Sequence, residues 1–268
     1  MSERLGLAAA PPSRTAEWSR TWDLLFAFTT RELILRYRGT VFGYVWWLAR
    51  PLALGLLLWF AMSKVLDVNI PDYHLFIMTG LFPWFWFSSA VSESTNVLVN
   101  NGPLLKKVPF PRVILPLSCA FGNAAQFVLT LPVLLAFVMI GGKSAEPVWL
   151  IGIPFLILLQ FTLTVGIGMA LSPLNVFLRD MAPLVEVTTT MLFYASAVIF
   201  PLDRVPEGMR PIVHLNPIAS LMEGWRSVIL EGAVPGIDIW PALVSAALAA
   251  VVGLIIFRAL ENHVADGI

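Results

Sequence analysis

Charge is scarce in this sequence. Only 13% of its 268 residues are Asp, Glu, Lys or Arg, whereas a soluble domain carries about 25%. The formal net charge is zero, so the chain lacks the basic excess typical of proteins that bind nucleic acid. A soluble enzyme of this length would need a polar surface that so few charges cannot supply, and 58% of the residues are hydrophobic. The composition therefore predicts an integral membrane protein rather than a soluble or a disordered chain.

Cysteine and histidine are also rare. The single cysteine, Cys119, lies in an apolar run and cannot form an intrachain disulfide. The three histidines are far apart, and the chain has neither an HExxH nor a GxSxG motif. Gly142-Lys143-Ser144 resembles the end of a phosphate-binding loop, but Phe137 stands where that loop needs its first glycine. We therefore expect no catalytic residue, no metal site and no cofactor bound by this chain.

The chain is rich in long apolar runs. A helix needs about 20 apolar residues to cross a bilayer core of about 30 Å. Six segments qualify or nearly qualify: 41–65, 75–99, 113–140, 148–174, 182–200 and 239–260. The sequence thus predicts an all-α integral membrane protein with six transmembrane helices and both termini on one side of the membrane.

Basic residues orient these spans. When the termini and the loops 100–112 and 173–181 are placed inside, most of the 17 Lys and Arg residues fall on that side. The exceptions are Lys64, Lys143, Arg204, Arg210 and Arg226. Because cytoplasmic loops carry an excess of Lys and Arg, we expect a multi-pass protein of the cytoplasmic (inner) membrane with both termini in the cytoplasm.

The segment before the first span predicts an amphipathic helix. On a helical wheel of residues 17–38, Trp18, Trp22, Leu25 and Leu33 share one side, and arginines lie roughly opposite. This pattern favours an N-terminal helix along the cytoplasmic interface, with the first helix of a small soluble cap as the alternative. Residues 1–16 are expected to form a flexible tail rather than a signal peptide, because their apolar piece is too short.

The segment before the last span predicts a different structure. Prolines divide residues 201–238 into short amphipathic pieces that are too short to cross a membrane and too apolar for a solvated loop. Short external re-entrant helices would account for both properties. We therefore expect residues 17–268 to form one transmembrane domain.

Aromatic residues gather at two places. The stretch Phe82 to Phe87 holds five aromatic rings in six positions, and Trp46-Trp47 stand near the start of the first span. Such clusters are typical of an aromatic belt at the membrane interface. They would also suit a slide for sugars, because the apolar C–H faces of pyranose rings stack on aromatic rings. Composition leaves both interpretations open.

Polar groups near the spans allow more than one interpretation. Charges at membrane depth usually face a cavity, a partner or the interface. Arg50 is an interface anchor or a contact to an anionic headgroup or partner subunit, and Glu93 has similar alternatives. The basic loop 100–112 and the loop at residues 175–180 are either topology determinants or a docking surface for a cytosolic motor.

Several short motifs follow one another through this layout. They are Arg31-Glu32-Leu33 with Arg36-Tyr37-Arg38, Gly43-x-x-Trp46 with Pro51, Gly80-Leu81-Phe82-Pro83-Trp84-Phe85, Lys106-Lys107-Val108-Pro109-Phe110-Pro111, Asn175-Val176-Phe177-x-Arg179-Asp180, and Asn216-Pro217. Their order resembles that of the permease subunits of ABC-2 type polysaccharide exporters, which include O-antigen, capsule and teichoic-acid exporters. The resemblance extends from about residue 17 to the C-terminus.

The resemblance implies a homodimer joined to two copies of a separate ATP-binding cassette subunit, which would bind the ATP and Mg. It implies that this chain is no enzyme but the channel-forming subunit that moves a polysaccharide linked to undecaprenyl diphosphate, such as O-antigen. The outer re-entrant helices would close the channel, and no nucleic acid would take part.

The resemblance also implies roles for particular residues. Aromatic side chains would line the path, and the candidates are Trp46, Phe82, Trp84 and Trp86. As a separate hypothesis on physical grounds, the diphosphate headgroup would be drawn to the planar guanidinium groups of Arg36, Arg38 and Arg50, although Arg50 is not part of the family pattern. Coupling to the motor would involve Arg31, Lys106, Lys107, Arg179 and Asp180. Three alternatives stay open: a permease for a small lipid or drug, a proton-driven carrier, and an autonomous membrane enzyme.

Overall fold

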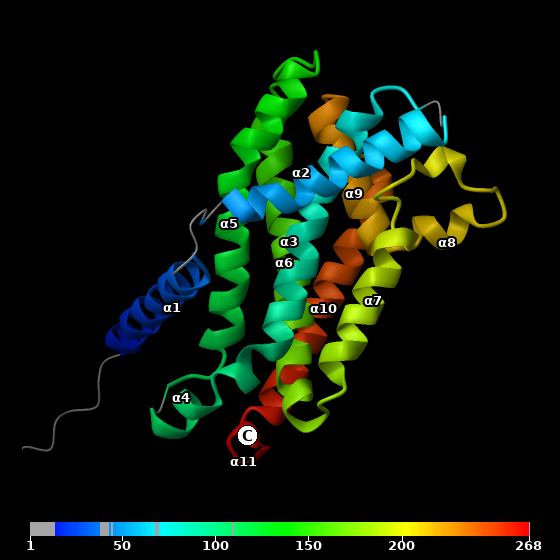
Figure 1. The fold of residues 1–268 in the computed structure, drawn as a ribbon. Helices are drawn as coiled ribbons and strands as arrows, with labels where there is room; N and C mark the ends of the chain where they lie inside the picture. Colours follow the sequence, from blue (N-terminus) through cyan, green and yellow to red (C-terminus); the bar gives the residue numbers. More distant parts are fainter. Residues whose placement is uncertain (1–13, 38–42, 44, 68–69, 109, 268) are drawn as a thin grey trace, which may run out of the picture.

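In the computed structural model, every regular element of the described residues is a helix (Figure 1). The structure describes residues 14–37, 43, 45–67, 70–108 and 110–267. Within these residues, five helical segments are long and apolar enough to cross a membrane. They are α2 continued by η1 (Val45–Val65), α3 (Tyr73–Asn100), α5 (Ile114–Ile140), α6 (Trp149–Phe177), and η3 continued by α10 (Ile237–Leu260). The predicted class, an all-α multi-pass membrane protein, is confirmed.

The sixth predicted span is shorter than expected. Helix α7 covers Met181–Ala195, which is 15 residues, so at a rise of 1.5 Å per residue it is only about 22 Å long. The chain leaves the helix at Ser196, and Ala197 has a left-handed φ of 53°. The predicted end of this helix at residue 200 is therefore wrong, because residues 196–200 take an irregular path. A sixth crossing stays a prediction.

Helix α3 is the centre of the protomer. It packs against α2, α5, α6, α7 and α9 (Pro217–Leu230), and most of its side chains are buried. An aromatic or aliphatic residue on almost any side of α3 therefore meets a neighbouring helix.

Helices α6 and α10 make the most extensive helix contact in the protomer. Gly166 of α6 and Gly253 of α10 lie backbone against backbone, and a Cβ atom at Gly253 would overlap the Gly166 carbonyl oxygen. Small residues allow such close approach, and the resulting van der Waals contact is a main source of helix association in membranes.

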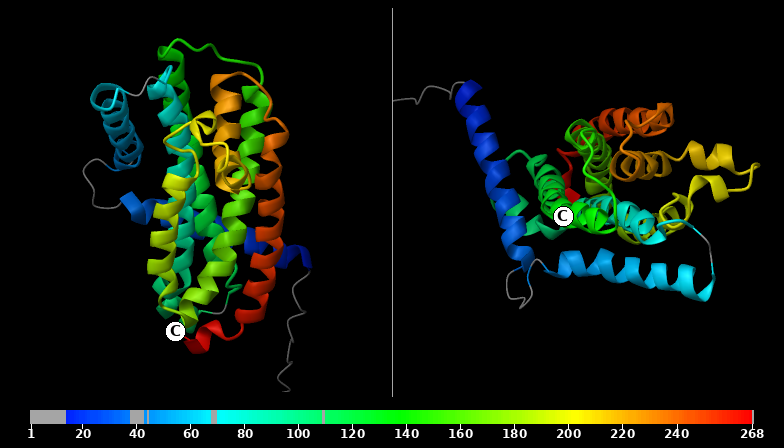
Figure 2. Two further views of the ribbon diagram at one scale, coloured as in Figure 1. Left: turned by 90° about the vertical axis from the view of Figure 1, so that its right-hand side faces the viewer. Right: turned by 90° about the horizontal axis from the view of Figure 1, so that it is seen from above.

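Helix α1 (Arg14–Tyr37) lies across the long helices and packs on α5 (Figure 2). Leu25 is buried there, and the ring of Phe28 stacks on Phe110 with 5.2 Å between centroids. Trp22 and Ile34 are exposed, whereas Leu25, which the wheel placed on the same side as Trp22, is buried. The crosswise direction is the one that an interface helix needs. Because α1 begins at Arg14, the end of the predicted tail 1–16 is helical, and residues 1–13 lie outside the described residues.

Helix α2 (Val45–Phe60) also runs across the long helices instead of alongside them (Figure 2). Pro51 and Gly55 are buried, and a Cβ atom at Gly55 would lie 2.6 Å from Met78 Cε of α3. Large apolar side chains on its other sides, such as Leu57 and Phe60, are exposed. Of the predicted first span 41–65, residues Val45–Val65 form an apolar helix long enough to cross a membrane, and residues 41, 42 and 44 lie outside the described residues. The direction of this helix in the protomer is not that of a lengthwise crossing (Figure 2). Its exposed apolar surface needs cover from lipid or another chain.

The two ends of the helix bundle carry different segments (Figure 1). The turn between α6 and α7, α4 (Gly102–Lys107) and α11 (Val264–Gly267) lie at one end. The α5–α6 turn, η2 (Leu202–Arg204), α8 (Arg210–His214) and α9 lie toward the other. The two loops predicted to share the inner side therefore lie at the same end, opposite the segment 201–238.

Candidate functional site

One side of α3 carries small polar groups next to α7. Ser88, Ser92 and Asn96 recur every four residues, which places them on one side of the helix. Ser92 is exposed, and the other two are half-buried. Asn96 Nδ2 donates to the Ser92 carbonyl at 3.1 Å, and the Ser88 hydroxyl donates to the Phe85 carbonyl at 3.4 Å. The Ser88 oxygen retains lone pairs that can accept a hydrogen bond from a ligand hydroxyl.

Helix α7 presents matching groups. The Thr189 hydroxyl donates to the Val185 carbonyl, and the Thr190 hydroxyl donates to the Glu186 carbonyl, both at 2.8 Å. The two hydroxyl oxygens, like that of Ser88, remain able to accept. Thr189, Thr190 and Ser88 line one hollow of about 230 Å³ between α2, α3 and α7.

Aromatic rings complete this hollow. Trp84 of α3 lies 5.5 Å from the ring of Phe193 on α7, which in turn lies 5.2 Å from Tyr194. All three rings line the hollow. The site therefore combines aromatic faces with hydroxyl acceptors, a combination that suits the alternating C–H and O–H surface of a sugar.

Two more hollows border α7. One of about 380 Å³ lies at its start and is lined by Asn96, Asn175, Arg179 and Ala182 among others. Another of about 500 Å³ lies at its end and is lined by Tyr194, Phe200, Met209 and Asn216 among others. Ala182, Thr189 and Tyr194 follow one another along α7, so the three hollows run from the α4 end of the bundle to the α8 end. We refer to this surface as the α3–α7 face.

Glu186 is the charged group of this helix. It is exposed between the first two hollows, and sequence reasoning overlooked it because the run 182–200 is apolar on average. A charge on a helix at the bilayer centre costs about 2.5–3.5 kcal/mol or more. Glu186 therefore favours water or a second protein chain over lipid as the neighbour of α7. The polar group Glu186-Val187-Thr188-Thr189-Thr190 inside an apolar run was the signal in the sequence.

The structure separates the four predicted path residues. Phe82 is 4% exposed and Trp86 is 0% exposed, so both pack inside the protomer. Trp86 stacks on Phe127 with 4.6 Å between centroids. Trp84 is only 5% exposed but borders the α3–α7 hollow, and Trp46 is 58% exposed at the start of α2. Consecutive aromatic residues on the central helix point to different neighbours, so the cluster does not act as one surface.

The predicted coupling residues lie at or near the α4 end. Arg31 Nη1 of α1 donates to Asn101 Oδ1 at 3.3 Å, directly before α4. Lys106 and Lys107 at the end of α4 are exposed. Arg179 and Asp180, in the α6–α7 turn, are exposed as well.

The predicted headgroup residues are more scattered. Arg36 lies in α1, Arg38 lies outside the described residues, and Arg50 is exposed on α2.

Glu93 joins α3 to α5, because its carboxylate accepts a hydrogen bond of 2.6 Å from Asn123 Nδ2. Cys119 Sγ lies 3.8 Å from the same carboxylate. Glu93 thus has a structural partner on α5.

Comparison with known proteins assigns the class. The family described as ABC-2 type transporter matches residues 23–230. This chain belongs to that family, as the sequence motifs predicted, and it is a multi-pass membrane protein.

Relatives in the family cover nearly the whole chain. An "O-antigen export system permease protein RfbA" of Klebsiella pneumoniae is 35% identical over 245 residues, which is 91% of this chain and 95% of that protein. A protein of the same name from Myxococcus xanthus is 34% identical over 231 residues, 85% of this chain and 87% of the relative. The "Polysialic acid transport protein KpsM" of Escherichia coli is 22% identical over 239 residues, 88% of this chain and 93% of that protein.

Proposed function

We propose that this chain is the permease subunit of an ATP-driven exporter of a polysaccharide such as O-antigen. The observation that carries the proposal is the identity of about one third, over almost the full length, with proteins named as O-antigen export permeases. In this proposal the cargo is a glycan linked to undecaprenyl diphosphate. It crosses the cytoplasmic membrane outward, and the termini of the chain lie in the cytoplasm.

The α3–α7 face supports a path between two copies of the chain. On one protomer its hollows are open to the outside, and a facing second copy would enclose them. Glu186 and the hydroxyls beside it would then face a wet path instead of lipid. A glycan moving along this path would stack on Phe193 and Tyr194 and donate hydrogen bonds to Ser88 and Thr189. Each contact is weak and exchangeable with water, so the glycan can slide.

The α4 end supports coupling to a separate subunit. Lys106 and Lys107 are exposed on a short helix that Arg31 braces through Asn101. Movement of a partner against α4 would be passed to α1 through Asn101 and to the end of α3. ATP and Mg bind in that partner, and this chain supplies no catalytic group. Arg36, Arg38 and Arg50 are proposed to attract the diphosphate on the cytoplasmic side.

The first test is purification of the tagged chain in mild detergent. An ATP-binding subunit in equal amount, with ATP hydrolysis that vanadate inhibits, is the expected result. If the chain purifies without an ATPase, the proposal of a motor-driven exporter is wrong, and transport by the chain alone would indicate a proton-driven carrier.

The second test addresses the cargo. Deletion of the gene should remove a surface glycan and leave its lipid-linked precursor in the cell. Complementation with Tyr194→Leu and Thr189→Val should restore less glycan than complementation with Leu150→Ala, whose side chain is exposed on α6 away from the α3–α7 hollows. A normal surface glycan in the deletion strain would instead favour a small lipid or drug as cargo.

A further inference from the structure

The irregular segment 196–200 after α7 is held by three side chains. The Tyr73 hydroxyl donates to the Ile199 carbonyl at 2.8 Å. Arg226 Nη2 donates to the Val198 carbonyl at 2.9 Å, and Asn216 Nδ2 donates to the Ser196 hydroxyl oxygen at 2.9 Å. Residues 196–199 are buried. The chain leaves the helical hydrogen-bond pattern here, and side chains from α3, α9 and the residue before α9 donate to its carbonyl and hydroxyl oxygens.

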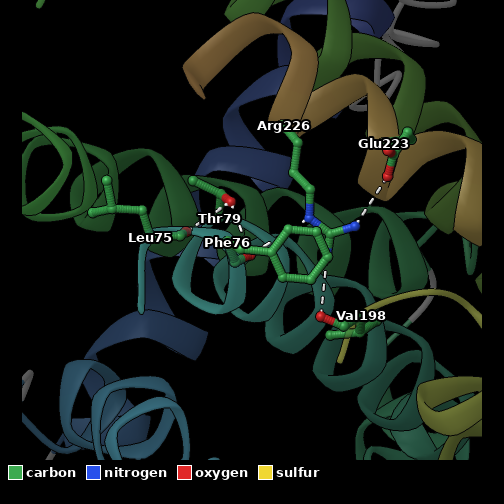
Figure 3. A network of polar contacts seen from close by, with 6 residues as sticks. All are labelled: Leu75, Phe76, Thr79, Val198, Glu223 and Arg226. Atoms are coloured by element: carbon green, nitrogen blue, oxygen red, sulfur yellow. Dashed lines mark hydrogen bonds and ion pairs between the residues drawn. The ribbon is translucent and has the colours of Figure 1, made fainter. Parts of the chain in front are cut away.

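Arg226 of α9 joins this segment to α3 as well as to its own helix (Figure 3). Its side chain is buried, with 3% of the residue exposed. Besides Val198, it contacts the Phe76 carbonyl through Nε at 3.4 Å and the Glu223 carboxylate through Nη1 at 3.0 Å. Its guanidinium carbon lies 3.6 Å from the centre of the Phe76 ring. Burial lowers the pKa of this guanidinium, and Glu223 opposes the shift. Removing one partner from such a buried charge is strongly unfavourable.

The same network explains a glycine of the sequence motif Gly80–Phe85. A Cβ atom at Gly80 would lie 2.8 Å from Arg226 Nη2 and 3.3 Å from the Val198 carbonyl oxygen. Contacts under 3.0 Å force a displacement. Glycine therefore leaves room for the guanidinium over α3, and a larger residue here would displace it.

The next segment, 201–215, is built differently, and we call it the cap. Arg210 connects α8 to the start of the cap, because its Nε donates to the Val205 carbonyl and its Nη2 to the Asp203 carbonyl, both at 2.9 Å. Met209, Ile212 and Leu215 are exposed. The hollow of about 500 Å³ lies between the cap and the end of α7. The cap is thus internally connected and has open space beneath it.

From this contrast we infer that Arg226 is a positioning residue that holds segment 196–200 against α3 and α9, so that the cap moves as one body about its two junctions, Phe200–Pro201 and Leu215–Asn216. We call the contacts of Arg226 with Val198, Phe76 and Glu223 the pin, and the inference about the pin rests on these contacts themselves. Its consequence rests on the proposed function: the cap closes the outer end of the α3–α7 path at rest, and the pin keeps α7 and α9 in place while the cap opens.

Hydrogen exchange of the purified full-length chain tests the pin. In Arg226→Met, the backbone amides of residues 196–200 should exchange about tenfold faster or more, since loss of the hydrogen bond from Arg226 to the Val198 carbonyl makes local opening of the segment easier. The amides of α6 and α10 should be unchanged. Arg226→Lys should give an intermediate rate, because an ammonium group keeps the charge but not the planar fork of donors. Arg258→Met, which removes an exposed arginine on α10, is the matched control and should match the wild type.

Gly80→Ala provides a second route to the same result. It displaces the guanidinium while Arg226 remains present, so it should also speed exchange at 196–200. Unchanged exchange at 196–200 in both variants would overturn the inference. An equal increase in all helices would overturn it too, because it would show a general loss of stability.

Leak of a trapped polar dye from vesicles containing the assembled transporter tests the consequence for transport. Without ATP, Arg226→Met should leak faster than the wild type and Arg258→Met. Faster exchange at residues 196–200 without a leak would support the positioning role of Arg226 and refute only the closing role of the cap. Loss of the exporter function in the tests above would not change the exchange result, so the two proposals can fail separately.

Discussion

The contact between α6 and α10 gives the sharpest stability prediction. In Gly253→Ala, the new Cβ atom would overlap the Gly166 carbonyl oxygen and lie 2.9 Å from the Gly166 carbonyl carbon, where ordinary contacts begin at 3.4 Å. The carbonyl carbon alone requires the helices to separate by about 0.5 Å, and neither backbone can rotate away as a side chain could. Overpacking of this kind costs about 1–3 kcal/mol. For a chain of this size that corresponds to a fall in Tm of about 2–12 °C.

A thermal melt of the detergent-solubilised protein, followed by the fraction that stays monodisperse, measures this effect. Gly122→Ala is the matched control, because Gly122 lies in α5 and nothing lies within 4 Å of its Cβ position. Alanine favours a helix over glycine by up to about 1 kcal/mol, so the control should melt at the wild-type temperature or slightly above it. Equal melting temperatures for Gly253→Ala and the wild type would refute the backbone-to-backbone packing.

Three further predictions follow from individual contacts. Trp225→Phe removes the indole donor to Gln160 Oε1 at 2.9 Å and should destabilise the protein by about 1–3 kcal/mol in the same melt; Gln160→Leu in addition should cost less than the sum of the two changes. Lys106→Glu with Lys107→Glu should reduce co-purification of the ATP-binding subunit without changing the melting temperature, and unchanged co-purification would exclude α4 as the docking site. Glu186→Leu should insert normally but lower the rate of glycan export, and a normal rate would show that the path does not need this charge.

Helix content and membrane character could be predicted because they depend on composition over long windows. A run such as 113–140 is apolar enough to be a span whatever surrounds it. The basic loops predicted the common end of α4 and the α6–α7 turn, since charge distribution is set by the membrane and not by packing. The motifs predicted the family, because their order along the chain carries that information without coordinates.

The position of the α3–α7 face could not be predicted in the same way. Helix α3 is apolar on nearly every side, so its periodicity did not show that Trp86 packs on Phe127 while Trp84 borders a hollow. Which side of such a helix faces a neighbour depends on where the neighbour lies.

The sequence by itself determined a chain of long apolar helices and its family, because each of these depends on residues close together in the chain. Only the tertiary structure decided the end of α7 and the role of Arg226. Arg226 meets Phe76, 150 positions earlier in the chain, and Val198. Its charge indicated an external loop in the sequence, but the folded chain surrounds it with carbonyl oxygens and an aromatic ring. A buried charge is tolerated when partners are supplied on several sides, and here those partners come from distant segments.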